Sequence, residues 1–296
     1  MADRSRHDSP KVPLAAAFAW LIGFALPLLA VGAAVAAQAV DIELILAVDV
    51  SGSVDPDEAQ LQRKGYEQAI VHSEVIQAIK AGPNGKIAVA YVEWAGMGYH
   101  KLVVDWTVID GPESAKAFVG KLAAQPIVTA HRTSLSGAID LSVPLFAAND
   151  FEGTRRIIDI SGDGANNYGR LVTEARDAAV KQGIIINGLP ILTSAGGTSG
   201  PSNANLDLFY RDCVIGGPGA FYVAARGFED FERAVRKKLI LEVAGRTPEP
   251  SGRTRAAIGG PERLWRTAEA DKRESPPCDI GESNWKNIIQ GGTIDR

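Results

Sequence analysis

The sequence predicts an α/β protein: a doubly wound, mostly parallel sheet with one antiparallel edge strand and helices on both faces. Apolar runs of strand length alternate along the chain with stretches of helical period, which is typical of a sheet covered on both sides. The runs are nearly uninterrupted in apolar residues, as in strands buried on both faces. Two neighbouring runs are joined by a link too short for a helix, which predicts one antiparallel pair.

The first predicted strand covers residues 42–48. Asp55 and Pro56 follow it as an N-cap and a first helical residue. Residues 86–94 and 101–109 form the antiparallel pair across a Gly-containing link. The remaining predicted elements are helices from Pro112 and from Ser134 (with Pro144 near its end), a strand at 156–160, a helix ended by Gly183, strands at 184–191 and 220–224, and a last helix from Phe228 to about Gly245.

The first 39 residues predict an export signal. Basic residues near the N-terminus precede an uncharged run over residues 12–40, which ends in the small-x-small pattern of signal peptidase sites at Ala39. Cleavage before Val40 predicts an exported protein, periplasmic or extracellular, with no stable membrane insertion. The alternative is an uncleaved N-terminal anchor, because the run is long enough to span a bilayer, although Pro13 and Pro27 weaken it.

The mature chain divides into one α/β domain over residues 40–245 and a tail over residues 246–296, rich in Gly and Pro, for which we expect a flexible extension. Two cysteines are too few for a disulfide scaffold or a four-thiolate zinc site. Outside the cytoplasm Cys213 and Cys278 are able to form a disulfide, which would pin the tail to the domain. Two unpaired thiols are the equal alternative.

The charge excludes one class of partner. Acidic residues (35) outnumber basic ones (31), the formal charge is −4, and no basic stripe occurs. Proteins that bind nucleic acid need clustered Lys and Arg against the phosphates, so we expect no nucleic-acid partner.

Oxygen-bearing side chains follow two predicted strands and begin one predicted helix. Asp49, Ser51 and Ser53 come directly after the first strand, Asp163 follows a later strand, and Thr133 begins a helix. The carboxyl ends of parallel strands meet at one edge of the sheet, where such folds bind ligands. Singly, each signal is also typical of a turn or a helix cap. Together they predict an all-oxygen site for a hard cation, Mg²⁺ (or Mn²⁺).

The order of these motifs resembles the metal-ion-dependent adhesion site of von Willebrand factor A domains, over about residues 41–245. The wider context, including residues 91–94, 160–164 and 214–219, is similar to a bacterial family of exported A-type domains whose function is uncharacterised.

The resemblance implies a role for each site residue. Ser51, Ser53 and Thr133 would hold the metal directly. Asp49 and Asp163 would act directly or through water. An Asp or Glu carboxylate of a protein partner would supply the last ligand.

The chain departs from the family pattern just before the Thr. The family often has two glycines there, and this chain has His131 and Arg132. Either the loop is stiffer or Arg132 turns toward the ligand carboxylate. Ser134 is the alternative to Thr133 as the metal-binding hydroxyl.

The expected function is therefore cation-dependent capture of a protein partner, with specificity from the loops at residues 96–100, 131–134, 165–168 and 194–205. The alternative is a structural or assembly factor of the envelope with a structural cation or none. A metal-assisted hydrolase is the weaker alternative. No Gly-x-Ser-x-Gly elbow occurs and no His adjoins a candidate nucleophile, so we expect no enzyme and no catalytic residues.

Overall fold

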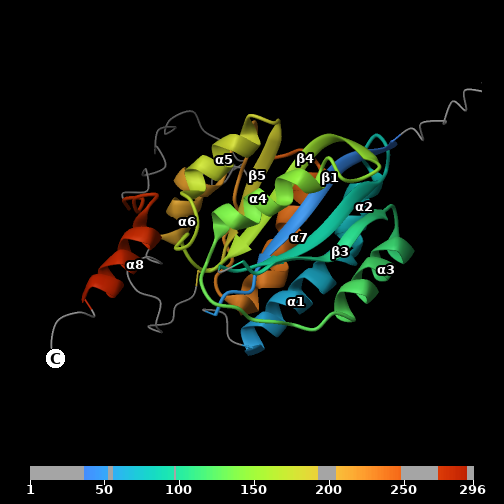
Figure 1. Ribbon diagram of the computed structural model, residues 1–296. Helices are drawn as coiled ribbons and strands as arrows, with labels where there is room; N and C mark the ends of the chain where they lie inside the picture. The colour runs from blue at the N-terminus through green and yellow to red at the C-terminus, as the bar shows by residue number, and fades with distance from the viewer. Residues whose placement is uncertain (1–36, 53–55, 97, 193–204, 248–272, 292–296) are drawn as a thin grey trace, which may run out of the picture. The chain divides into compact units, whose positions relative to one another are not determined.

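The computed structural model describes residues 37–52, 56–96, 98–192, 205–247 and 273–291, and the side chains among them up to residue 287. Most of the predicted export signal, Ser53 and most of the loop at 194–205 lie outside the described residues. The strands are β1 (Gln38–Asp49), β2 (Ile87–Trp94), β3 (His100–Ile109), β4 (Phe151–Gly162) and β5 (Ile184–Pro190). Their order is β3-β2-β1-β4-β5, and β3 alone of these five is antiparallel (Figure 1). The predicted sheet is confirmed.

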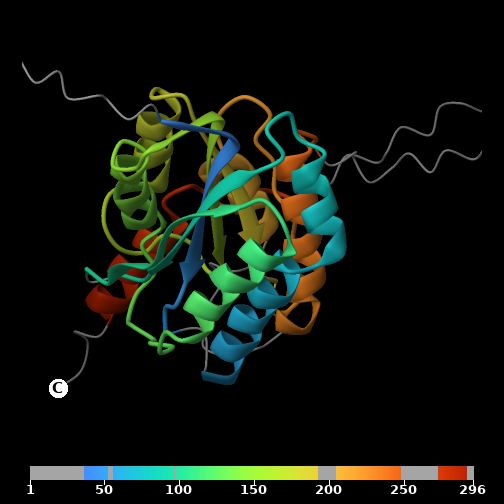
Figure 2. The ribbon, with the colours of Figure 1, turned by 90° about the vertical axis from the view of Figure 1, so that its right-hand side faces the viewer.

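Helices cover both faces of the sheet, which Figure 2 shows between two helical layers. One layer consists of α1 (Pro56–Ile70), α2 (Ser73–Lys80), α3 (Pro112–Ala123) and α7 (Phe231–Val243), which follows the short 3₁₀ helix η3 (Phe228–Asp230). The other consists of α4 (Leu135–Leu145), α5 (Val172–Val180), the short α6 (Leu206–Phe209), the π-helical turn η2 (Tyr210–Val214) and α8 (Ile280–Gly291).

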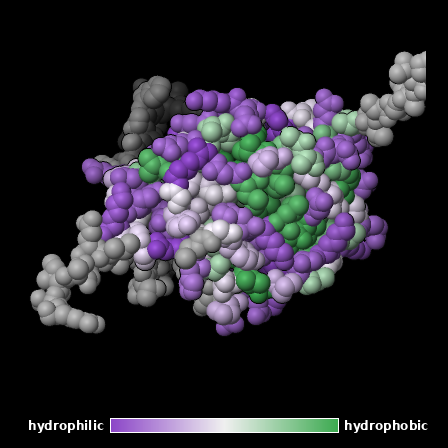
Figure 3. Space-filling model, in the orientation of Figure 1, coloured by the Kyte–Doolittle hydropathy of each residue, from purple (hydrophilic) through white to green (hydrophobic). Residues whose placement is uncertain are grey.

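The strands form because both of their faces are buried. Every residue of β2 is buried, and β1 is buried from Val40 to its end. Their side chains separate two hydrophobic cores, one under each helical layer. Beside α4, Leu102, Trp106 and Leu145 remain partly exposed on the second core, and hydrophobic side chains reach the surface on the face of Figure 1 (Figure 3).

The structure differs from the expected elements in several places. The short α6, the turn η2 and helix α8 were not expected, and α8 lies in the tail for which a flexible extension was expected. Residues 220–224 do not form a continuous strand: Tyr222 and Ala225 make isolated parallel bridges to Gly188 and Ile191. The segment that contains them has three Gly and one Pro just before it, which limits regular pairing. Helix α2, only eight residues long, was not expected, and β4 begins before the predicted 156–160. Among the described residues, no helix is both long and apolar enough to cross a membrane.

A group of charged residues is buried between α7 and the sheet. Lys238, fully buried, places its Nζ 2.6 Å from Asp159 Oδ1 and 2.5 Å from Glu242 Oε1. Asn187 donates to the same Glu242 oxygen at 2.9 Å. Burial and the neighbouring Glu242 raise the pKa of Asp159 to about 7, against the opposing effect of Lys238. The chain thus supplies its own cation to this carboxylate pair.

Candidate metal site

The site lies where the winding of the sheet changes direction. The chain leaves β1 toward β2 on one side and returns to β4 on the other, so the switch point lies between β1 and β4. Asp49 ends β1, and Asp163 follows directly after β4. Gln62 of α1 donates from Nε2 to the Asp49 carbonyl at 2.9 Å, which fixes the end of the strand. Two carboxylates are therefore held at one edge of the sheet.

The loop that carries Thr133 is tied to both strand ends. Ala130 pairs with Ser51 in a parallel bridge, its N–H donating to the Val50 carbonyl at 2.9 Å. Thr133 Oγ1 lies 3.4 Å from Ser51 Oγ. Asn167 and Thr133 exchange two hydrogen bonds of 2.9 Å, which link this loop to the segment after Asp163. The structure thus brings Asp49, Ser51, Thr133 and Asp163 together.

Asp49 is buried with an incomplete set of partners. It is 1% exposed, and Asp163 is 2% exposed. Its Oδ1 accepts a hydrogen bond of 2.7 Å from the Ser51 N–H, whereas its buried Oδ2 has no hydrogen-bond partner. Burial and then the charge of Asp163 hold the pKa of Asp49 well above its ordinary value, opposed by the bonds from Ser51. The bonds from Ser51 therefore compensate an ionised Asp49 only in part.

Gly162 leaves the space around that oxygen. A Cβ at this position would lie 2.9 Å from Asp49 Oδ2 and 3.0 Å from the Tyr210 hydroxyl. Tyr210 belongs to η2, is fully buried, and its hydroxyl also has no hydrogen-bond partner. Burial and the charges of Asp49 and Asp163 raise the pKa of this phenol. Two buried oxygens without a hydrogen-bond partner, Asp49 Oδ2 and the Tyr210 hydroxyl, thus lie where Gly162 has no side chain.

Sequence reasoning did not find Tyr210 because its place depends on the fold of η2. A π-helical turn such as η2 often occurs at a functional site, but it is recognised from the structure and not from the sequence.

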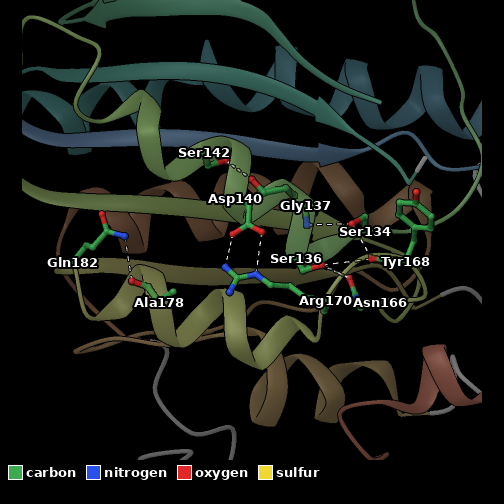
Figure 4. A network of polar contacts seen from close by, with 11 residues as sticks. Ser134, Ser136, Gly137, Asp140, Ser142, Asn166, Tyr168, Arg170, Ala178 and Gln182 are labelled. Atoms are coloured by element: carbon green, nitrogen blue, oxygen red, sulfur yellow. Dashed lines mark hydrogen bonds and ion pairs between the residues drawn. The ribbon is translucent and has the colours of Figure 1, made fainter. Parts of the chain in front are cut away.

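The start of α4 explains the choice between the two candidate hydroxyls. Ser134 is the N-cap of α4: its Oγ accepts from the Gly137 N–H at 3.1 Å and donates to the Tyr168 carbonyl at 2.9 Å (Figure 4). Asn166 accepts at Oδ1 from the Ser136 N–H at 3.0 Å. Ser134 is thus used by the helix, whereas Thr133 faces Ser51, which favours Thr133.

Arg132 contacts the C-terminal helix. Its φ of 71° is in the left-handed region that favours glycine. Its guanidinium lies over the ring of Trp285 in α8, 3.3 Å from the ring centroid. In this structure Arg132 therefore stacks on the C-terminal helix.

The donor set fits a hard cation. Carboxylate and hydroxyl oxygens are the ligands of Mg²⁺ and Mn²⁺, and the uncompensated Asp49 Oδ2 is a position that a positive charge would stabilise. Among the described residues, no group of three or more His, Cys, Asp or Glu is placed to hold a metal ion. The candidate site is therefore of the mixed carboxylate and hydroxyl type, and Ser53 lies outside the described residues.

A comparison with protein families matches residues 39–247 to the family described as "Protein of unknown function (DUF1194)". The chain belongs to this family. A comparison with curated proteins gives no match.

Several solved structures are similar to this DUF1194 protein. One is the pilus adhesin SpaC from Lactobacillus rhamnosus GG in its open conformation, with 13% identity and a TM-score of 0.51, over 70% of this chain and 31% of the adhesin. Another is a von Willebrand factor type A protein from Catenulispora acidiphila, with 12% identity and a TM-score of 0.47, over 70% and 43% of the two chains. The chain thus spans about a third of the length of SpaC. The likeness to SpaC concerns the fold alone, and it agrees with the predicted doubly wound α/β sheet.

A third structure is proximal thread matrix protein 1 from the mussel byssus, described with a zinc-occupied MIDAS motif. It is 15% identical, with a TM-score of 0.48, over 71% of this chain and 47% of its own.

Proposed function

We propose that this protein is a binding module that captures an acidic residue of a protein partner through a divalent cation, Mg²⁺ or Mn²⁺. The observation that carries the proposal is the buried Asp49 carboxylate beside Asp163, with one oxygen lacking a hydrogen-bond partner. A bound cation would supply the missing positive charge and a coordination position for the partner's Asp or Glu.

The site residues would contact the cation in two ways. Ser51, Ser53 and Thr133 would offer their hydroxyls to it directly, and Asp49 and Asp163 would contact it directly or through water. This assignment is supported by the 3.4 Å approach of Thr133 Oγ1 to Ser51 Oγ. No catalytic role is proposed for any of these residues.

We also propose export, with signal cleavage before Val40. Val40 is buried in β1, whereas Gln38 and Ala39 are exposed. Cleavage there would remove the exposed start of the strand and its pairing with Phe151 and Glu152, and would keep the buried part. The disulfide that joins Cys213 to Cys278 in the structure suits an oxidising compartment. The mass of the mature protein, with and without reductant, tests both points.

The direct test of the cation is thermal unfolding of the mature chain with Mg²⁺, with Mn²⁺ and with chelator. A cation that binds only the folded state adds about 2.7 kcal/mol at a hundred times its Kd. We expect Asp163→Ala to lose this shift. Asp140→Ala, a carboxylate that is about half exposed and pairs with Arg170, should keep it.

No shift in wild type up to millimolar cation would contradict the proposal and favour the envelope structural factor. A shift together with partner binding that is insensitive to chelator would assign the cation a purely structural role.

A further inference from the structure

The C-terminal segment, defined here as residues 273–287, is held on the domain beside the candidate site. The disulfide joins Cys278 to Cys213, in the same η2 turn as Tyr210. Arg273 makes two hydrogen bonds to the Asp207 carboxylate, of 2.7 and 3.1 Å. The segment thus has a covalent attachment and a charged one, both on the α6–η2 region.

Its first contact with the rim of the site is made by Glu282. Asn166 donates from Nδ2 to Glu282 Oε1 at 2.7 Å, and this Asn166 is fully buried three residues after Asp163. A Cβ at the neighbouring Gly281 would lie 2.0 Å from the Asn166 carbonyl oxygen, so only a glycine allows α8 to approach this loop so closely.

Its second contact is made by Trp285. The Arg132 guanidinium stacks over the Trp285 ring, 3.3 Å from the ring centroid. Glu282 and Trp285 are three positions apart on α8, so they lie on one face of the helix. They contact two loops that are expected to recognise a partner: the loop at residues 131–134, which contains Thr133, and the loop at residues 165–168, which follows Asp163.

The fit of this helix leaves polar groups unsatisfied. Glu282 Oε2 and Asn284 Nδ2 are buried without a hydrogen-bond partner. Burial raises the pKa of Glu282, against the bond from Asn166. Buried polar atoms without partners reduce the stability of a contact, so the docked α8 is open to replacement by a segment that satisfies the same surface more completely.

We propose that the face formed by Arg132 and Asn166 recognises a helix carrying an acidic residue followed three positions later by an aromatic one, and that α8 occupies this face as an intramolecular ligand which a partner must displace. The inference rests on the proposed function, whose binding face it specifies. Because the disulfide tethers α8, its effective concentration at this face is of the order of millimolar, as for short flexible linkers. A free partner helix therefore competes with a permanently present occupant.

The test uses the full mature chain and a fluorescein-labelled synthetic peptide of residues 276–290 that carries Cys278→Ser. Fluorescence anisotropy in chelator gives the Kd for wild type, for the released variant Glu282→Gln/Trp285→Ala, and for the control Lys286→Ala, which changes an exposed residue of the same helix. We expect the released variant to bind the peptide at least tenfold more tightly than wild type or the control. Adding Arg132→Ala to it should weaken binding at least fivefold.

Equal affinity in wild type and released variant, or no binding to the released variant, would overturn the inference. If the released variant does not fold, hydrogen exchange of wild type and Arg132→Ala replaces it: the amides of residues 283–287 should exchange at least tenfold faster in the variant, and unchanged exchange contradicts the inference. Since Glu282 binds Asn166, the peptide should bind without cation. If the peptide does not bind as expected but the cation still raises the unfolding temperature, only this inference is rejected. If the cation does not raise the unfolding temperature, the proposed function is rejected.

Discussion

Two pairs of buried carboxylates lie at different places along the same sheet, and they differ in whether a lysine of the chain neutralises their charge. Asp159 and Glu242 share the Nζ of Lys238 at 2.6 and 2.5 Å. Asp49 and Asp163 repel each other, and no ion pair among the described residues involves Asp49. The first pair belongs to the core between β4 and α7, and the second lies at the edge where the loops converge.

The difference separates a structural charge cluster from a binding site. A buried carboxylate is costly unless a positive charge or hydrogen bonds compensate it. The pair in the core has a positive charge from the chain itself, the ammonium of Lys238, although Glu242 Oε2 is also buried without a hydrogen-bond partner. The pair at the edge leaves Asp49 Oδ2 without a hydrogen-bond partner, so an external cation is the compensation that we propose.

The largest expected effect comes from removing the lysine. Lys238→Met would leave Asp159 and Glu242 buried without a cation, so the free energy of unfolding at pH 7 should fall by about 3 to 5 kcal/mol, as when a buried pair loses one partner. Urea unfolding measures it. The neighbouring Lys237 is exposed, and Lys237→Met should change stability by no more than about 0.5 kcal/mol. Similar losses in both variants would contradict the role given to Lys238.

The pH dependence of stability follows from Asp159. Its pKa is about 7 in the folded protein against an ordinary 3.8, so between these values the folded state binds more protons than the unfolded state. This group therefore favours folding at low pH, and its contribution is lost as the pH rises through about 7. Wild type should lose stability relative to Asp159→Asn over this window. A difference between the two proteins that is flat with pH would refute the assignment.

A smaller effect is expected at Gly162. In Gly162→Ala the new Cβ would crowd Asp49 Oδ2 at 2.9 Å, and strain of this kind costs about 1 to 3 kcal/mol. The variant should also lose most of the cation-dependent thermal shift. Gly120, on the exposed side of α3, has open space around the same position, so Gly120→Ala should gain about 0.5 to 1 kcal/mol and keep the shift. Retention of the shift in Gly162→Ala would show that the site does not need this space.

The smallest effect separates two buried tyrosines. The Tyr66 hydroxyl bonds Ser161 Oγ at 3.1 Å, whereas the Tyr210 hydroxyl has no hydrogen-bond partner. In chelator, Tyr66→Phe should lose about 1 kcal/mol. Tyr210→Phe should lose nothing or gain about 1 kcal/mol, because a buried hydroxyl without a partner is removed. Equal losses in urea unfolding would mean that the Tyr210 hydroxyl does have a partner in solution.

The strands and the grouping of the site residues could be predicted because their signals are local. Apolar runs such as residues 42–48 are buried on both faces in any parallel sheet, and residues after the ends of β1 and β4 must meet once the strands are neighbours. The sequence therefore placed Asp49 and Asp163 at one edge without knowledge of the loops.

The contacts of the C-terminal segment could not be predicted because they depend on residues far apart in the chain. Helix α8 follows a Gly- and Pro-rich stretch, and its docking depends on Cys213, Asn166 and Arg132, which lie 65 to 153 positions from their partners. The pairing of Lys238 with Asp159 likewise requires α7 to lie across β4. Helix α2 was missed because it is short and is capped by His72, an unusual cap residue.

The most direct test of the comparison is the binding of Mn²⁺ measured by calorimetry for wild type, Asp49→Asn and Asp159→Asn. The two substitutions are chemically identical and both remove a buried carboxylate. We predict one Mn²⁺ bound by wild type and by Asp159→Asn with similar Kd, and at least tenfold weaker binding by Asp49→Asn. Equal Mn²⁺ affinity in all three proteins, or none in wild type, would contradict the claim that the carboxylate pair at the sheet edge is the one that takes its cation from solution.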